Sequence, residues 1–145
     1  MKLCAAVFGL LVLCFSLPSQ AFRLIGEDEA KFPEAAPIKN RAISRGPGIK
    51  LVSPDPELGA VKAPFGLKIA FEPHGGAKID PSTVKVTYLK ATPVDLLDRL
   101  KPGLTATGID LAGADAPVGD HQIYVSLQDS EGRKSNTVIN IKVTK

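Results

Sequence analysis

The sequence contains little cysteine and no tryptophan. Its 145 residues include 2 cysteines, Cys4 and Cys14, and both lie in an apolar N-terminal segment. If that segment is removed, the remaining chain has no thiol and must fold without disulfides, even in an oxidising compartment. Tyr88 and Tyr124 are the only tyrosines. The remaining length is sufficient for one domain and too short for a second.

The N-terminal segment has the features of an export signal. Lys2 gives a positive start, Leu3 to Leu17 is an apolar run, and Ser19 to Ala21 places small side chains where a signal peptidase cuts. We therefore predict a signal peptide over residues 1–21 and a mature chain that begins at Phe22. Such a chain would be periplasmic or secreted.

Two alternatives to cleavage would leave this segment on the mature protein: a membrane anchor and a lipoprotein. A retained membrane anchor needs about 20 apolar residues, and the run here is shorter and ends at Pro18. A lipoprotein needs a small residue before the modified cysteine, whereas Leu3 precedes Cys4 and Leu13 precedes Cys14. Both observations favour cleavage, with no stable membrane insertion of the mature chain.

Neither sign of charge dominates the mature chain. The full sequence has 18 basic and 15 acidic side chains, and Lys2 is the only one of them before Phe22. A balance this close to neutral leaves no electrostatic footprint for nucleic acid, so nucleic acid is not an expected partner. No cofactor is expected either.

Sequence motifs for catalysis are also missing. The chain has no HExxH pair, no GxSxG elbow and no phosphate-binding Gly-Lys-Ser/Thr loop. Its 2 histidines are His74, in a glycine-rich turn, and His121, near the start of a predicted strand. We expect a solvated loop residue at His74 and a packed or hydrogen-bonded residue at His121. A small exported enzyme or metal carrier that uses both is the alternative.

Residues 22–47 differ from the rest of the chain. Charges of both signs and several prolines interrupt them, and neither a helical nor a strand period is sustained. Such a stretch buries too little apolar surface to offset the entropy lost on ordering, so we predict a flexible leader. The alternative is a basic docking arm formed by Lys39, Arg41 and Arg45.

Apolar and polar residues alternate after residue 48, which is the period of strands with one buried face. Turn residues separate the strands; in Asp129-Ser130-Glu131-Gly132, for example, Gly132 stands where a left-handed residue is usually required. The clear segments are 65–72, 84–89, 122–128 and 138–143, and the weaker ones are Ile49 to Ser53 and Leu104 to Leu111.

One short helix is predicted near residues 93–100, with Thr92 as N-cap, Pro93 in the first turn and Pro102-Gly103 as the stop. About six to seven strands without βαβ alternation favour an antiparallel two-layer sandwich, because a single sheet would leave its apolar row uncovered. The predicted fold class is therefore all-β, with the sandwich domain over residues 48–145.

Turn and core residues of this domain resemble a known family. They are Pro64-Phe65 with the strand that follows, Ile79 to Val86, Pro117 to His121, and Asp129 to Arg133. Together they resemble the bacterial immunoglobulin-like domains, of Big or fibronectin III-like type, of exported proteins. The resemblance implies a Greek-key sandwich without disulfide or tryptophan that serves adhesion, spacing or recognition. Because members often occur as repeats and this chain has a single copy, recognition is favoured over spacing.

Copper and calcium are the metals to consider. A fainter similarity, through Ser53-Pro54, Pro64 and Leu67 to Phe71, is to periplasmic copper carriers. That family uses an N-terminal histidine and a late Asp-x-His element, and this sequence has neither. Calcium could be held by oxygen ligands from several loops, although aspartates in such places also form turns. The acidic candidates are Asp55, Glu57, Asp80, Asp110, Asp115, Asp120 and Asp129.

The sequence thus predicts a non-enzymatic exported module that binds a protein or glycan partner in the cell envelope or outside the cell. On sandwich scaffolds function concentrates in loops, which here are residues 72–78, 112–121 and 129–134. No catalytic, cofactor or metal residue is assigned, and a periplasmic copper- or calcium-binding protein is the alternative. The candidate partner-binding residues are His74, Asp115, Arg133 and Lys134.

Overall fold

The computed structural model describes residues 21–38 and 45–145. The predicted signal peptide and the basic residues Lys39 and Arg41 of the alternative docking arm therefore lie outside the described residues. Within the described ranges, no helix has the length and apolar character that a membrane span requires.

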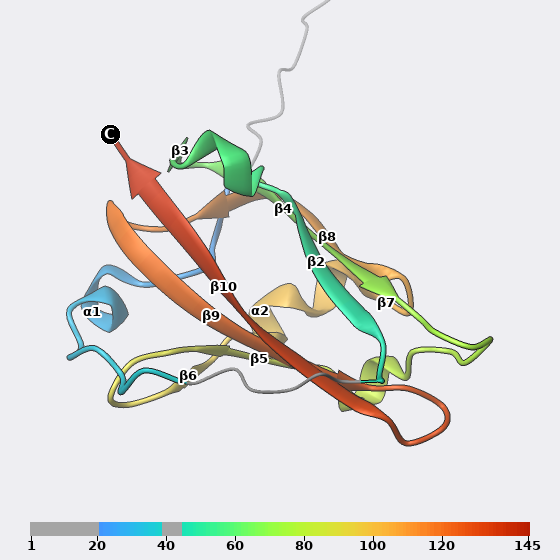
Figure 1. The fold of residues 1–145 in the computed structure, drawn as a ribbon. Coiled ribbons are helices and arrows are strands. Elements are labelled where there is room, and N and C mark those ends of the chain that lie inside the picture. The colour runs from blue at the N-terminus through green and yellow to red at the C-terminus, as the bar shows by residue number, and fades with distance from the viewer. Residues whose placement is uncertain (1–20, 39–44) are drawn as a thin grey trace, which may run out of the picture.

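The first sheet has the strand order β1-β8-β4-β2, with β7 also paired to β8 (Figure 1). β2 is antiparallel to β4 and β4 is antiparallel to β8, whereas the short β1 is parallel to β8. The strands are β1 (Phe22–Arg23), β2 (Gly48–Ser53), β4 (Phe65–Glu72), β7 (Leu104–Thr105) and β8 (Gly108–Asp115).

The second sheet has the order β3-β10-β9-β5-β6. Its largest element is the β9–β10 hairpin, and β3 pairs in parallel with the last residues of β10. Because each sheet contains one parallel pair, the predicted purely antiparallel sandwich is wrong in this detail. The strands are β3 (Val61–Lys62), β5 (Lys85–Tyr88), β6 (Val94–Asp95), β9 (Gly119–Gln128) and β10 (Lys134–Thr144).

The sheets bury their alternating apolar rows against each other, which confirms a mainly β fold with two layers. Along β4, Phe65, Leu67, Ile69 and Phe71 are all buried while the residues between them are more exposed. The facing row of the second sheet comes from β5, β9 and β10 and includes Val86, Ile123, Val125, Ile139 and Ile141.

Gly108 divides a segment that the sequence pattern joined. It has a φ of +151°, and a Cβ at this position would lie only 2.1 Å from the carbonyl oxygen of Ile69 on β4. Only glycine tolerates that conformation and that close approach. The predicted strand from Leu104 to Leu111 is therefore two strands, β7 and β8.

The flexible leader predicted over residues 22–47 is wrong for its first part. Leu24 is fully buried and Ile25 is 2% exposed, and the backbone N–H of Leu24 donates to the carbonyl oxygen of Asp115. Helix α1 (Glu27–Ala30) follows, and Glu34 forms an isolated bridge with Lys90. Two adjacent apolar residues are too few to produce a period, which is why the pattern missed them.

The helix predicted near 93–100 is shorter than expected. Residues Val94–Asp95 form β6 against β5, and α2 covers only Leu97–Leu100. Thr92 is not the N-cap; instead Asp95 Oδ1 accepts a hydrogen bond from the Leu97 N–H. The remaining helical segments are the 3-10 turns η1 (Pro56–Leu58), η2 (Pro81–Thr83) and η3 (Lys101–Gly103).

Candidate functional site

The β9–β10 turn is held by a buried carboxylate. Asp129 is 3% exposed, and its Oδ1 accepts hydrogen bonds of 2.9 Å from the backbone N–H groups of Glu131 and Arg133. Its Oδ2 accepts a 2.8 Å bond from Arg133 Nε. Burial alone would raise the pKa of Asp129, but these hydrogen bonds outweigh it and hold the pKa below its usual value.

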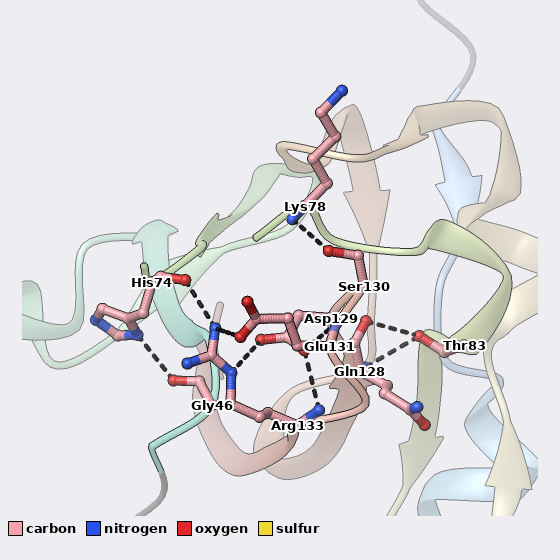
Figure 2. Close-up of polar contacts among 9 residues, drawn as sticks. All are labelled: Gly46, His74, Lys78, Thr83, Gln128, Asp129, Ser130, Glu131 and Arg133. Carbon is pink, nitrogen blue, oxygen red and sulfur yellow. Dashed lines mark hydrogen bonds and ion pairs between the residues drawn. The ribbon is translucent and has the colours of Figure 1, made fainter. Parts of the chain in front are cut away.

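Arg133 extends this network to the loop after β4 (Figure 2). Its Nη2 donates to the carbonyl oxygen of His74 at 2.8 Å and lies 2.9 Å from a carboxylate oxygen of Glu131. His74 Nδ1 lies 2.8 Å from the carbonyl oxygen of Gly46, which can only accept, so Nδ1 carries the hydrogen. We name Gly46, His74, Lys78 and residues 129–133 the hairpin end.

The structure brings together some of the predicted partner-binding residues. His74 and Arg133 meet at the hairpin end, and Lys134 follows Arg133 at the start of β10. Asp115 lies at the opposite end of the sandwich, where it is the neighbour of Arg23 in the register between β1 and β8. The loops 72–78 and 129–134 therefore share an end, and the loop 112–121 is on the other.

A buried polar chain occupies that opposite end. His121 is 2% exposed, and its Nε2 lies 2.7 Å from the carbonyl oxygen of Pro117. Because that oxygen only accepts, Nε2 is the donor and Nδ1 accepts the 2.9 Å bond from Tyr88. The Lys90 ammonium lies 5.4 Å from the centre of the Tyr88 ring and pairs with Glu34.

The histidines do not form a joint site. His121 is near the start of β9, and His74 contacts Arg133, which follows the other end of that strand. The 8-residue step from His121 to Asp129 along the chain corresponds to roughly 26 Å of extended strand. The prediction that His121 packs or hydrogen-bonds in the sandwich is confirmed.

Several of the acidic calcium candidates form turns. Asp55 Oδ1 accepts from the Glu57 N–H, and Asp80 Oδ1 accepts from the backbone N–H and the hydroxyl of Ser82. Over the part of the chain that the structure describes, no group of three or more His, Cys, Asp or Glu side chains is placed to hold a metal ion.

A polar surface that the sequence did not single out covers the side of the second sheet that faces away from the core. Cross-strand register aligns its residues in rows: Thr87, Tyr124 and Val138 form the central row, with Gln122 beside Asn140 and Ser126 beside Asn136 on either side of it. We name this surface the outer face. Its members, all exposed or half-buried, are Lys62, Lys85, Thr87, Asp95, Asp120, Gln122, Tyr124, Ser126, Gln128, Lys134, Asn136, Val138, Asn140, Lys142 and Thr144.

Two hollows adjoin the outer face. A cavity of about 630 Å³ runs along β10 and is lined on one side by Asp120, Gln122, Asn140 and Lys142 and on the other by the core residues Ile139 and Ile141 and by Ile49 and Leu51 of β2. A second cavity of about 260 Å³ is lined by Lys85, Tyr124, Ser126 and Asn136 among others. Sequence alternation identified the polar rows on each strand, but only the strand register brings them side by side.

Comparisons with protein-family models, with curated proteins and with solved structures found no match to this chain.

Proposed function

We propose that the chain is an exported, non-enzymatic module with an immunoglobulin-like fold that binds a protein or glycan partner in the cell envelope or outside the cell. Its partner surface is the outer face. The predicted loop residues His74 and Arg133 support the scaffold, because His74 Nδ1 and the Nε and Nη2 of Arg133 bond within the hairpin end.

The strand order supports the immunoglobulin-like part of this proposal. In immunoglobulin sandwiches the first, second and fifth strands share one sheet, and the third, sixth and seventh share the other. Here β2, β4 and β8 correspond to the first set, and β5, β9 and β10 correspond to the second. The chain also moves from the edge of the first sheet at β2 to the edge of the second at β3.

The observation that carries the binding proposal is the hydrogen-bonding capacity of three exposed amides on the outer face. Each amide of Gln122, Asn136 and Asn140 offers both donors and an acceptor, and all of these side chains are exposed. On a monomeric fold such a row has no packing role. It is suited to contacts with a ligand, in contrast with the engaged groups of the hairpin end.

A photo-crosslinking derivative of phenylalanine, which keeps an aromatic ring, introduced in place of Tyr124 in cells of the source organism tests the proposal. We expect an adduct at this position and none when the same amino acid replaces Lys68 on the other sheet. Protease digestion of the adduct then separates a protein partner from a glycan. Adducts at neither position, or equally at both, would contradict the proposed partner surface.

The exported state is tested separately by intact mass. We expect the chain recovered outside the cytoplasm to begin at Phe22. A mass that retains residues 1–21, or one that carries lipid, would refute the export proposal.

A further inference from the structure

We propose that the outer face binds a linear polysaccharide that carries carboxylate groups. This inference rests on the proposed function and specifies its ligand. It follows from the hydrogen-bonding side chains, the central aromatic ring, the charges and the length of the surface.

The neutral side chains of the outer face match the chemistry of sugar hydroxyls. A hydroxyl both donates and accepts, and so does a carboxamide. Gln122 and Asn140 lie directly opposite each other on neighbouring strands, and so do Ser126 and Asn136. These two pairs flank the central row on both sides, so one extended ligand can meet hydrogen-bonding groups along the whole β9–β10 ribbon.

Tyr124 supplies a platform at the centre of the surface. It is half-buried and lies between Thr87 and Val138 in the register of the sheet. An aromatic ring there can pack against the C–H side of a sugar ring while its hydroxyl stays hydrated. A protein partner would instead favour an apolar centre depleted of lysine, and the exposed large apolar residues of the described chain lie elsewhere: Phe32, Ile38, Val52, Leu58 and Val118.

The charges of the surface favour an anionic ligand. Lys85 and Lys134 lie toward the hairpin end, and Lys62 and Lys142 lie toward the other. The carboxylates of this surface are Asp120 and Asp95, and Asp95 Oδ1 already accepts a hydrogen bond from the Leu97 N–H. Lysines therefore outnumber carboxylates on the outer face. Lys85 lies in the row of Ser126 and Asn136, and the 6-residue step from Asn136 to Lys142 spans roughly 20 Å of strand. A linear chain with carboxylates along its length can meet both lysines, because lysine heads act as separate point charges on flexible stems.

The two cavities beside the outer face can accommodate parts of an extended ligand. The larger cavity, of about 630 Å³, adjoins Gln122, Asn140 and Lys142, and the smaller one, of about 260 Å³, adjoins Lys85, Ser126 and Asn136. Tyr124 lines the smaller cavity and its neighbour Val138 lines the larger. A polysaccharide that lies along the ribbon would therefore enter both hollows and cross the tyrosine between them.

The test uses the exported chain and oligogalacturonate as the probe, with binding measured by calorimetry. We expect binding that weakens as salt increases, since exposed charges are screened. Replacing both Lys85 and Lys142 with Ala should weaken it about tenfold, a loss of about 1.4 kcal/mol. The matched control replaces Lys50 and Lys68, exposed on the first sheet, with Ala; it changes the net charge equally and should leave affinity within about twofold.

The role of Tyr124 is tested with a pair of variants. Tyr124→Ala should weaken binding at least about tenfold, whereas Tyr124→Phe should retain it, because the ring is kept. Melting temperatures of all variants establish that they are folded.

Three results would overturn the inference. One is no binding of oligogalacturonate by the unmodified chain; another is equal binding of neutral dextran; the third is an equal loss in the Lys50 and Lys68 control. If any of these occurs while Tyr124 still crosslinks to a protein in cells, the polysaccharide inference fails and the proposed binding function stands. If crosslinking is also lost, both fail.

Discussion

The hairpin end and the outer face share strands β9 and β10 and are both polar, yet they differ in what their polar groups contact. At the hairpin end Asp129, Arg133 and His74 bond to each other and to nearby backbone. On the outer face the amides of Gln122 and Asn140 stand side by side and are exposed to solvent. The polar groups of the hairpin end thus bond within the protein, whereas the amides of the outer face are exposed to solvent.

This difference shows that a charged residue that is conspicuous in the sequence can serve the scaffold. Arg133 is conspicuous as a charged residue in a predicted turn. Its Nε, however, donates to Asp129 and its Nη2 donates to the carbonyl oxygen of His74, so its guanidinium stabilises the turn. A buried carboxylate with its partners satisfied organises the loop, and removing a partner leaves an unpaired buried group. Neutral amides, which attract less notice in a sequence, provide the unengaged groups.

The largest expected change in the free energy of unfolding concerns the N-terminal segment that contains Leu24. Leu24 is fully buried in the core, so Leu24→Ala should destabilise the fold by roughly 2 to 4 kcal/mol. Chemical denaturation of the purified mature chain measures this. Phe32→Ala, in the same segment but 37% exposed and outside the core cluster, is the control and should cost about 1 kcal/mol or less. Equal, small effects would mean that the segment is not part of the folded core.

The next effect addresses the hairpin end directly. Arg133→Ala leaves the buried Asp129 Oδ2 without a hydrogen-bond donor and removes one of the two donors to the His74 carbonyl oxygen, the other being the Ala77 N–H. We therefore expect a loss of about 1 to 2 kcal/mol. Lys78 is the matched control because its side chain extends away from the network in Figure 2, and Lys78→Ala should be close to neutral. A neutral Arg133→Ala variant that loses partner capture would instead restore the loop residues as the binding site.

A smaller, pH-dependent effect concerns the ion pair between Glu29 and Arg99. Arg99 Nη2 donates to Glu29 Oε1 at 2.6 Å, and its Nη1 also reaches the carbonyl oxygen of Leu24 at 2.8 Å. Hydrogen bonding to Arg99, against some cost of burial, lowers the pKa of Glu29 from 4.5 to about 2. The group is partly exposed, so solvent screening limits its contribution to about 1 kcal/mol.

The sign of this contribution fixes its pH window. Because the folded-state pKa is depressed, the stabilisation is complete above pH 4.5 and is lost as the pH falls toward about 2. Glu29→Gln should therefore be less stable than the unmodified chain at neutral pH and equally stable near pH 2. Thermal melts across this range measure it, and a difference that is constant with pH would refute the assignment.

The smallest expected effect on stability is on the outer face. Replacing Gln122 and Asn140 together with Ala should change the free energy of unfolding by no more than about 0.5 kcal/mol, since both are exposed and away from the core. The same variant should lose partner binding. A destabilisation as large as that of Arg133→Ala would remove the contrast between the two regions.

The strands of the sandwich were predictable because period-two alternation survives in the sequence. The segment from Phe65 to Glu72 and the strand that contains Ile123, Val125 and Leu127 appear in the structure with the expected faces buried. The buried Leu24–Ile25 pair was not predictable, since its burial depends on pairing with Asp115, far along the chain. In the same way, Val94 and Asp95 pair with β5 instead of starting a helix.

The candidate surface shows the same limit. Alternation identified the polar residues of each strand, but a one-residue change of register would have placed different side chains next to Tyr124. Likewise, the meeting of His74 with Arg133 depends on how the loop after β4 reaches the β9–β10 turn. Contacts between segments distant in the sequence decide both regions.

The positions of Phe22 and Lys145 bear on how the module would respond to mechanical force. Phe22 pairs beside Ala114, which itself lies opposite Phe65, and Val143 lies opposite Gly119 and Val61. Both extremities of the folded chain are therefore at the same end, with the Asp129–Lys134 tip pointing the opposite way. Tension applied between Phe22 and Lys145 would therefore peel the short β1 and β3 contacts without stretching the sandwich along its long axis.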